Sequence, residues 1–180
     1  MSLLTSFAPF LAFAVLIHLG FMEAALWAGA AAAAGLLLRD RMLGRSIKIL
    51  EVGTLVLFAA LAIYTQASGR AWTIPFIRLV VDEGLFLIVL ASLAFGEPFT
   101  LQYARETTPP EFWGSPKFLS VNRTITLVWA GAFAVLVLAD LAMVYVPAIP
   151  RRLDILATVL ALVGAYIFTV RATARAEDLA

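Results

Sequence analysis

The chain has 180 residues, of which 63% are hydrophobic and only 14% are charged, and its mean hydropathy is +0.97. A soluble domain carries roughly 45–50% apolar and about 25% charged residues, so this composition excludes an ordinary water-soluble fold and extended disorder. The net charge of +1 gives no field that would attract nucleic acid, and the lack of cysteine excludes disulfides and thiol-based metal sites. We therefore expect an all-α integral membrane protein with one transmembrane helical domain over residues 1–180.

The first apolar stretch, residues 7–38, is too long for a single span. As one straight helix it would measure about 48 Å, whereas the hydrocarbon core of a bilayer is about 30 Å thick. Gly20 and Glu23 interrupt the stretch, so we expect a short interfacial or re-entrant segment over 3–19, followed by a span over 22–38. The alternative is a six-span arrangement in which the chain folds back near Gly20.

Four further apolar stretches each match the length of one membrane-spanning helix, for which about 20 residues are needed. Together with 22–38 they predict about five spans. The four stretches are residues 49–65, 74–95, 124–146 and 153–170. Small residues from Ala28 to Gly35 would let a neighbouring helix approach closely, either within the chain or across a dimer seam, and we favour the internal contact.

The distribution of Lys and Arg predicts an orientation. These residues are concentrated in the first and third connections and in the C-terminal tail, which lie on one side of a five-span protein. Since the richer side normally faces the cytoplasm, we expect the N-terminus outside and the C-terminus in the cytoplasm.

The longest connection, residues 96–123, is predicted to be a cytoplasmic amphipathic segment with a short helix near 99–107. Its aromatic and charged residues alternate, as in segments that lie at the headgroup layer. One interpretation is a solvated loop that its aromatic rings anchor to the membrane. The other is a surface that docks a partner, for which the candidate residues are Tyr103, Arg105, Glu106 and Trp113.

Ionisable residues within the spans form the second candidate site. Each costs about 2.5–3.5 kcal/mol at mid-helix, so each needs an explanation. In the predicted topology five of them share the outer half of the membrane, and Arg78 and Asp82 lie one helical turn apart. This polar intramembrane cluster consists of Glu23, Arg78, Asp82, Glu83 and Asp140.

Three accounts of the polar cluster are open. It is a buried network that fixes helix packing, a proton or cation site, or a set of side chains that reach the interface. The second account follows from charge, because one Arg cannot neutralise four carboxylates. A further acid, Glu51, is expected to pair with Arg45 or Lys48 at the inner end of its span.

The sequence contains no motif of a known catalytic or metal site. His18 is the single histidine, so one chain cannot supply two axial ligands to haem, and its expected role is packing or a hydrogen bond. We expect no enzymatic activity, no cofactor and no bound metal.

Several short motifs resemble one family. These are FAPF at 7–10, EPF at 97–99, PEFW at 110–113, and the residues Asn122 and Trp129, set in a layout of about five spans. In this respect the chain is similar to the intracellular septation protein A family of bacterial inner membrane-spanning proteins, or to a sister family. The resemblance implies a location in the bacterial inner membrane and a role in envelope maintenance or septation through protein partners, with no defined reaction.

Three hypotheses of function follow from the sequence. The first is the partner-dependent envelope protein that the resemblance implies. The second is a small proton- or cation-coupled transporter or channel that uses Asp82, Glu83 and Asp140. The third is an accessory helical subunit of a larger membrane complex. The expected partners are the lipid bilayer and either other membrane proteins or a second copy of the chain, and not nucleic acid.

Overall fold

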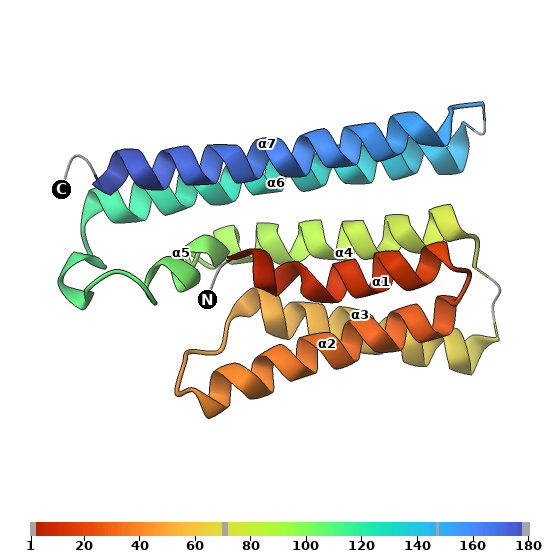
Figure 1. Ribbon diagram of the computed structural model, residues 1–180, viewed down its shortest axis with the longest axis horizontal. Coiled ribbons are helices and arrows are strands. Elements are labelled where there is room, and N and C mark those ends of the chain that lie inside the picture. The colour runs from red at the N-terminus through yellow and green to blue at the C-terminus, as the bar shows by residue number, and fades with distance from the viewer. Residues whose placement is uncertain (1–2, 70–71, 147, 178–180) are drawn as a thin grey trace. The chain divides into compact units, whose positions relative to one another are not determined.

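The computed structural model describes the backbone of residues 3–69, 72–146 and 148–177, and every regular element in these ranges is helical (Figure 1). The predicted all-α class is thereby confirmed for the described residues. The chain forms two compact units, Met1–Ile77 and Arg78–Ala180. The first contains η1 Leu3–Phe7, α1 Ala8–His18, α2 Met22–Met42 and α3 Ile49–Ser68. The second contains most of α4 Ile74–Ala94, and then α5 Phe99–Ala104, η2 Pro110–Phe112, α6 Pro116–Tyr145 and α7 Arg151–Glu177.

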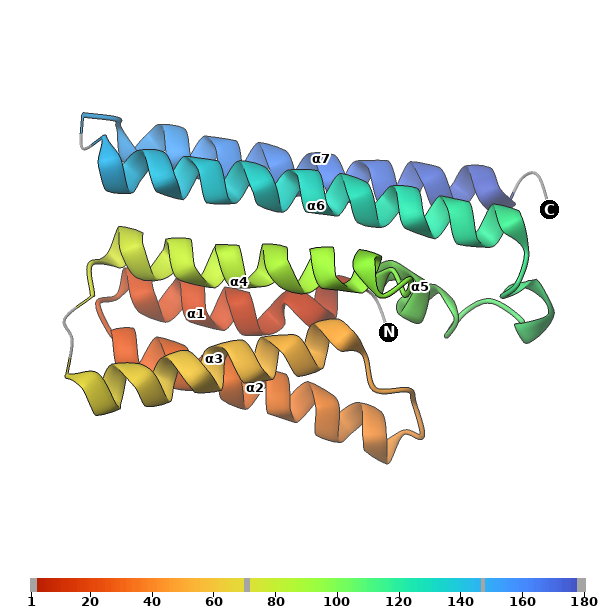
Figure 2. The ribbon, with the colours of Figure 1, turned by 180° about the vertical axis from the view of Figure 1, so that it is seen from behind.

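In the first unit the chain reverses at Gly20. This residue has a φ of +87°, a conformation that glycine adopts without a steric penalty, and it separates α1 from α2. The two helices then run antiparallel, and both views show them side by side (Figures 1 and 2). The fold-back lies where the six-span alternative placed it. However, α1 has 11 residues, about 16 Å, and is shorter than the hydrocarbon core.

The stretch of small residues in α2 lies against α3. A Cβ atom on Gly29 would lie only 2.8 Å from the ring of Phe58, so the two helices approach as closely as glycine permits. Phe58 is fully buried, and its ring centroid lies 5.3 Å from that of Phe10 and 5.5 Å from that of Phe13. The internal contact that the sequence favoured is therefore present in the first unit.

In the second unit α6 and α7 form a long antiparallel pair (Figures 1 and 2). The helix α6 begins at Pro116, well before the predicted span 124–146. Ser115 explains this early start, because its side-chain oxygen accepts a hydrogen bond of 3.2 Å from the backbone N–H of Phe118 and so caps the helix. Proline at the first position also suits a helix start. The helix thus extends beyond the apolar stretch that the sequence marks.

The short helix α5 packs against α6 through buried hydroxyl groups. Thr100 Oγ1 donates to the carbonyl oxygen of Asn122 over 2.9 Å and lies 2.8 Å from Oγ1 of Thr126. At the start of α5 the backbone N–H of Phe99 donates to Oγ of Ser92 over 3.1 Å. The beginning of the long connection is therefore part of the folded unit.

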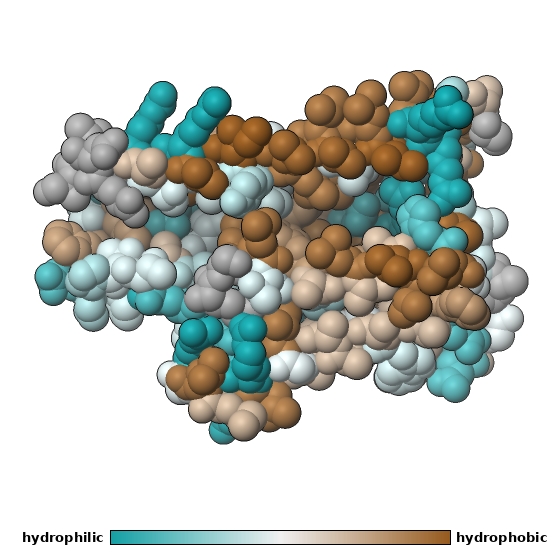
Figure 3. All heavy atoms as spheres, viewed as in Figure 1, coloured by the Kyte–Doolittle hydropathy of each residue, from teal (hydrophilic) through white to brown (hydrophobic). Residues whose placement is uncertain are grey.

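Four helices of the described chain, α2, α3, α6 and α7, are long and apolar enough to cross a membrane. The helix α4 is as long, with 21 residues, and is set apart from these four by the three ionisable residues of its apolar stretch, Arg78, Asp82 and Glu83. The count of about five spans therefore stays a prediction. Figure 3 shows hydrophobic side chains along the middle of α7 and hydrophilic ones at its two ends, as expected for a helix whose middle lies in lipid.

The contact between Gly29 and Phe58 predicts the effect of a single methyl group. We expect Gly29→Ala to destabilise the protein by about 1–3 kcal/mol, because the buried ring of Phe58 must move to admit the new atom. The matched control is Gly35→Ala in the same helix, where no atom lies within 4 Å of the added Cβ. That variant should be neutral or more stable by up to about 1 kcal/mol, since alanine is the better helix former. Unfolding of detergent-solubilised protein by SDS, followed by circular dichroism, measures both, and equal effects would contradict the prediction.

Candidate functional site

Arg78, near the start of α4, lies between carboxylates from two other helices of the second unit. Its Nη2 is 3.1 Å from Oδ1 of Asp140 near the end of α6, and its Nη1 is 2.7 Å from Oδ2 of Asp154 in the first turn of α7. Both acidic side chains are 1% exposed, whereas that of Arg78 is 16% exposed. One guanidinium therefore joins α4, α6 and α7 at one end of the second unit.

A third carboxyl group, that of Asp82, joins this arrangement from one turn further along α4. It interacts electrostatically with Asp140, Arg78 and Asp154. Like charges on neighbouring carboxyl groups repel one another, and this repulsion favours a proton on one of them. We call Arg78, Asp82, Asp140 and Asp154 the carboxyl cluster.

The structure brings together three of the five residues that the sequence assigned to the polar intramembrane cluster. Arg78, Asp82 and Asp140 lie together, as described. Glu83 follows Asp82 by about 100° around α4, and its side chain is exposed. Glu23 belongs to the first unit, where it is exposed in the first turn of α2.

Asp154 is the member that the sequence analysis missed. It lies in the first turn of α7, where the positive end of the helix dipole stabilises an acidic side chain. An acidic residue at this position therefore does not by itself indicate a partner. The predicted topology did contain a signal. The start of the last span and the end of the preceding one lie on the same side of the membrane, so Asp154 falls at the depth of Asp140.

The carboxyl cluster has an excess of acid over base. It contains three carboxyl groups and one guanidinium, and fixed charges of one sign are costly in a buried site. Protonation of one carboxyl group would reduce this excess. The arrangement thus joins three helices and leaves more carboxyl groups than the single guanidinium can neutralise.

Of the proposed docking residues, most are engaged within the second unit. Tyr103 is buried, and Glu106 is half-buried. The guanidinium of Arg105 pairs with Glu97 over 3.0 Å, and its central carbon lies 5.6 Å from the centroid of a Trp113 ring. These side chains hold the connection together, whereas the neighbouring residues 109–112 are exposed.

Metal and haem sites were not expected from the sequence. Within the described residues no group of three or more His, Asp or Glu side chains is arranged to hold a metal ion. The ring of His18 is exposed, and its Nδ1 lies 2.7 Å from the carbonyl oxygen of Ala14, which accepts a hydrogen bond one turn earlier in α1.

No protein-family model, no curated protein and no solved structure matches this chain. The similarity to the intracellular septation protein A family stays a prediction that the short motifs of the sequence carry.

Removal of the guanidinium tests the clamp. We expect Arg78→Met to destabilise the protein by about 3 kcal/mol at pH 8, because it leaves buried carboxylates without a counter-charge. The loss should be smaller at pH 4, where protonated carboxyl groups need no cation. SDS or thermal unfolding in detergent at the two pH values measures this difference.

The matched control is Arg151→Met, which removes an exposed arginine just before Asp154. It should change stability by less than about 0.5 kcal/mol. Adding Asp154→Asn to Arg78→Met should recover part of the lost stability. A pH-independent loss, or no recovery in the double variant, would show that Arg78 does not act through these charges.

Proposed function

We propose that this chain is a multi-pass membrane protein with five spans, namely α2, α3, α4, α6 and α7. The inclusion of α4 rests on the ion pairs of Arg78, because a charged side chain is tolerated in lipid when it faces the protein interior and is paired. In this proposal the N-terminus is outside and the C-terminus is in the cytoplasm of a bacterial inner membrane. The distribution of Lys and Arg supports the orientation.

Within this framework, the function that the geometry supports best is proton-coupled transport or proton conduction through the carboxyl cluster. The observation that carries it is the gathering of three carboxyl groups, those of Asp82, Asp140 and Asp154, around a single guanidinium. A proton bound there changes the charge of the cluster and so changes the attraction of Asp140 for Arg78. Gain or loss of the proton is thereby linked to the contact between α4 and α6.

The variant Asp82→Asn tests this proposal. In proteoliposomes loaded with a pH-sensitive dye, a potassium diffusion potential should drive proton uptake by the wild-type protein. Asp82→Asn should reduce the rate at least tenfold, since an amide has nearly the size of the carboxyl group but releases no proton. The matched control is Glu83→Gln, which removes an exposed carboxylate from the next residue of α4 and should keep the wild-type rate.

Two results would overturn the proposal. One is a wild-type rate equal to that of empty liposomes, and the other is an equal loss in both variants. Each variant must elute from the detergent column as the wild-type protein does, so that a loss of flux is not a loss of fold. If the wild-type protein carries no protons while Arg78→Met still destabilises it, the cluster is a clamp alone.

A second candidate is the partner-dependent envelope protein that the family resemblance implies. The observation that favours it is the exposure of residues 109–112, including Phe112, next to the packed start of the connection. An exposed aromatic side chain on a segment anchored at both ends is a suitable contact for another protein.

Photo-crosslinking in cells tests this second candidate. A photoreactive amino acid in place of Glu111 should give a discrete protein adduct, and Phe112→Ala in the same chain should weaken it several-fold. The same amino acid in place of Arg152, an exposed position before α7, is the control and should not give that adduct. An adduct of equal yield at both positions would reject a specific partner at residues 109–112.

A further inference from the structure

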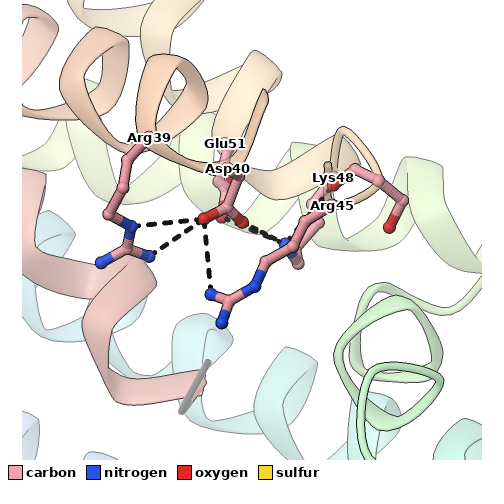
Figure 4. Close-up of polar contacts among 6 residues, drawn as sticks. Arg39, Asp40, Arg45, Lys48 and Glu51 are labelled. Atoms are coloured by element: carbon pink, nitrogen blue, oxygen red, sulfur yellow. Dashed lines mark hydrogen bonds and ion pairs between the residues drawn. The ribbon is translucent and has the colours of Figure 1, made fainter. Parts of the chain in front are cut away.

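A second group of charges lies at the turn between α2 and α3, and Asp40 is at its centre (Figure 4). This residue, in the last turn of α2, accepts hydrogen bonds from Arg39 and from Lys48, and Nη1 of Arg45 lies 3.8 Å from its Oδ1. The backbone N–H of Arg45 also donates to the carbonyl oxygen of Asp40 over 2.9 Å, across a turn in which Gly44 has a φ of +67°. One carboxylate thus organises three cations and the loop that carries two of them.

The acidic and basic side chains of this turn differ in exposure. Asp40 and Glu51 are buried, and Glu51 lies 3.9 Å from the buried Nζ of Lys48, the pairing expected from the sequence. By contrast, Arg39 and Arg45 are 41% and 36% exposed. Arg41 is also exposed and forms no ion pair within the part of the chain that the structure describes. The charge that this turn presents to its surroundings is therefore positive.

Apolar side chains are exposed among these arginines. They belong to the last turn of α2 and to the loop, and they are Leu38, Met42, Leu43 and Ile47. Figure 3 shows hydrophilic and hydrophobic side chains mixed over this tip of the α2–α3 hairpin. Exposure of these apolar side chains to water is unfavourable. The boundary between lipid headgroups and acyl chains is a better environment for this surface, because it accommodates aliphatic side chains and guanidinium groups together.

We propose that the α2–α3 turn binds the phosphodiester headgroup of an anionic phospholipid, with Arg39, Arg41 and Arg45 as its ligands. Guanidinium groups offer paired donors that match phosphate oxygens, and basic residues next to a membrane span attract anionic lipid. Asp40 is a positioning residue, since its contacts with Arg39 and Arg45 hold two of the three guanidinium groups. Membrane insertion is assumed here as in the proposed function, whereas proton transport is not.

Spin-labelled lipids in reconstituted bilayers test this inference. With the full chain in phosphatidylcholine vesicles, the immobilised fraction of labelled phosphatidylglycerol should exceed that of labelled phosphatidylcholine several-fold. The variant Arg41→Gln with Arg45→Gln should lose most of this preference. The charge-matched control is Arg151→Gln with Arg152→Gln. It removes two exposed arginines at the start of α7 and should keep the preference for phosphatidylglycerol.

Two further measurements separate the alternatives. Raising salt from about 20 mM to about 500 mM should reduce the preference, because an exposed charge contact is screened. Inorganic phosphate at the same ionic strength should reduce it no more than chloride does, and a stronger effect would show a site for free phosphate instead. Equal loss in both double variants, or no preference in the wild-type protein, would overturn the inference.

The single variant Arg41→Gln should keep the native fold, because this side chain forms no ion pair among the described residues. It should lose part of the preference, and Arg41→Lys should restore it. The lipid preference does not depend on proton flux, so the lipid-binding inference and the proposed proton transport can fail independently of each other.

Discussion

The guanidinium of Arg78 is the contact on which the second unit depends. It joins the start of α4 to the end of α6 and the start of α7 through Asp140 and Asp154. A planar group with five donors meets two carboxylates from two directions, which a lysine ammonium does less well. Without this cation, like charges from Asp140 and Asp154 would face each other beside a buried helix end. The turn between α6 and α7 therefore relies on a residue more than sixty positions away in sequence.

The same physical rule operates around Asp40 in the first unit, with the signs reversed. There, one buried carboxylate faces cations from the α2–α3 turn, and the exposed charge that results is positive. In the carboxyl cluster, three acidic groups outnumber the single base. Both arrangements remove the cost of ionised groups in an apolar chain by pairing them. They differ in the groups that remain in excess after pairing, which are exposed arginines in the first unit and a carboxyl group in the second.

The helical class could be predicted from sequence because long apolar stretches leave little choice of structure. Polar partners were harder to predict. Asp154 has a sufficient local explanation as a first-turn acid, and Asp40 lies among arginines that are typical of any cytoplasmic connection, so neither stands out from sequence. Tyr103 shows the opposite difficulty. The alternation of aromatic and charged residues made it a candidate for docking a partner, whereas its side chain is buried in α5, which the hydroxyl contacts of Thr100 join to α6. Tertiary pairing, rather than local pattern, decides all three.

Asp82 separates the two roles of the carboxyl cluster. A clamp between α4, α6 and α7 is complete with Arg78, Asp140 and Asp154, because each helix then contributes one charged group. A third carboxyl group on α4 adds no new helix to the clamp and increases the excess of acid. If packing were the whole purpose, an uncharged hydrogen-bonding side chain at this position would serve Asp140 at lower cost. A titratable group at this position is what the proposed proton transport requires, and a clamp alone does not.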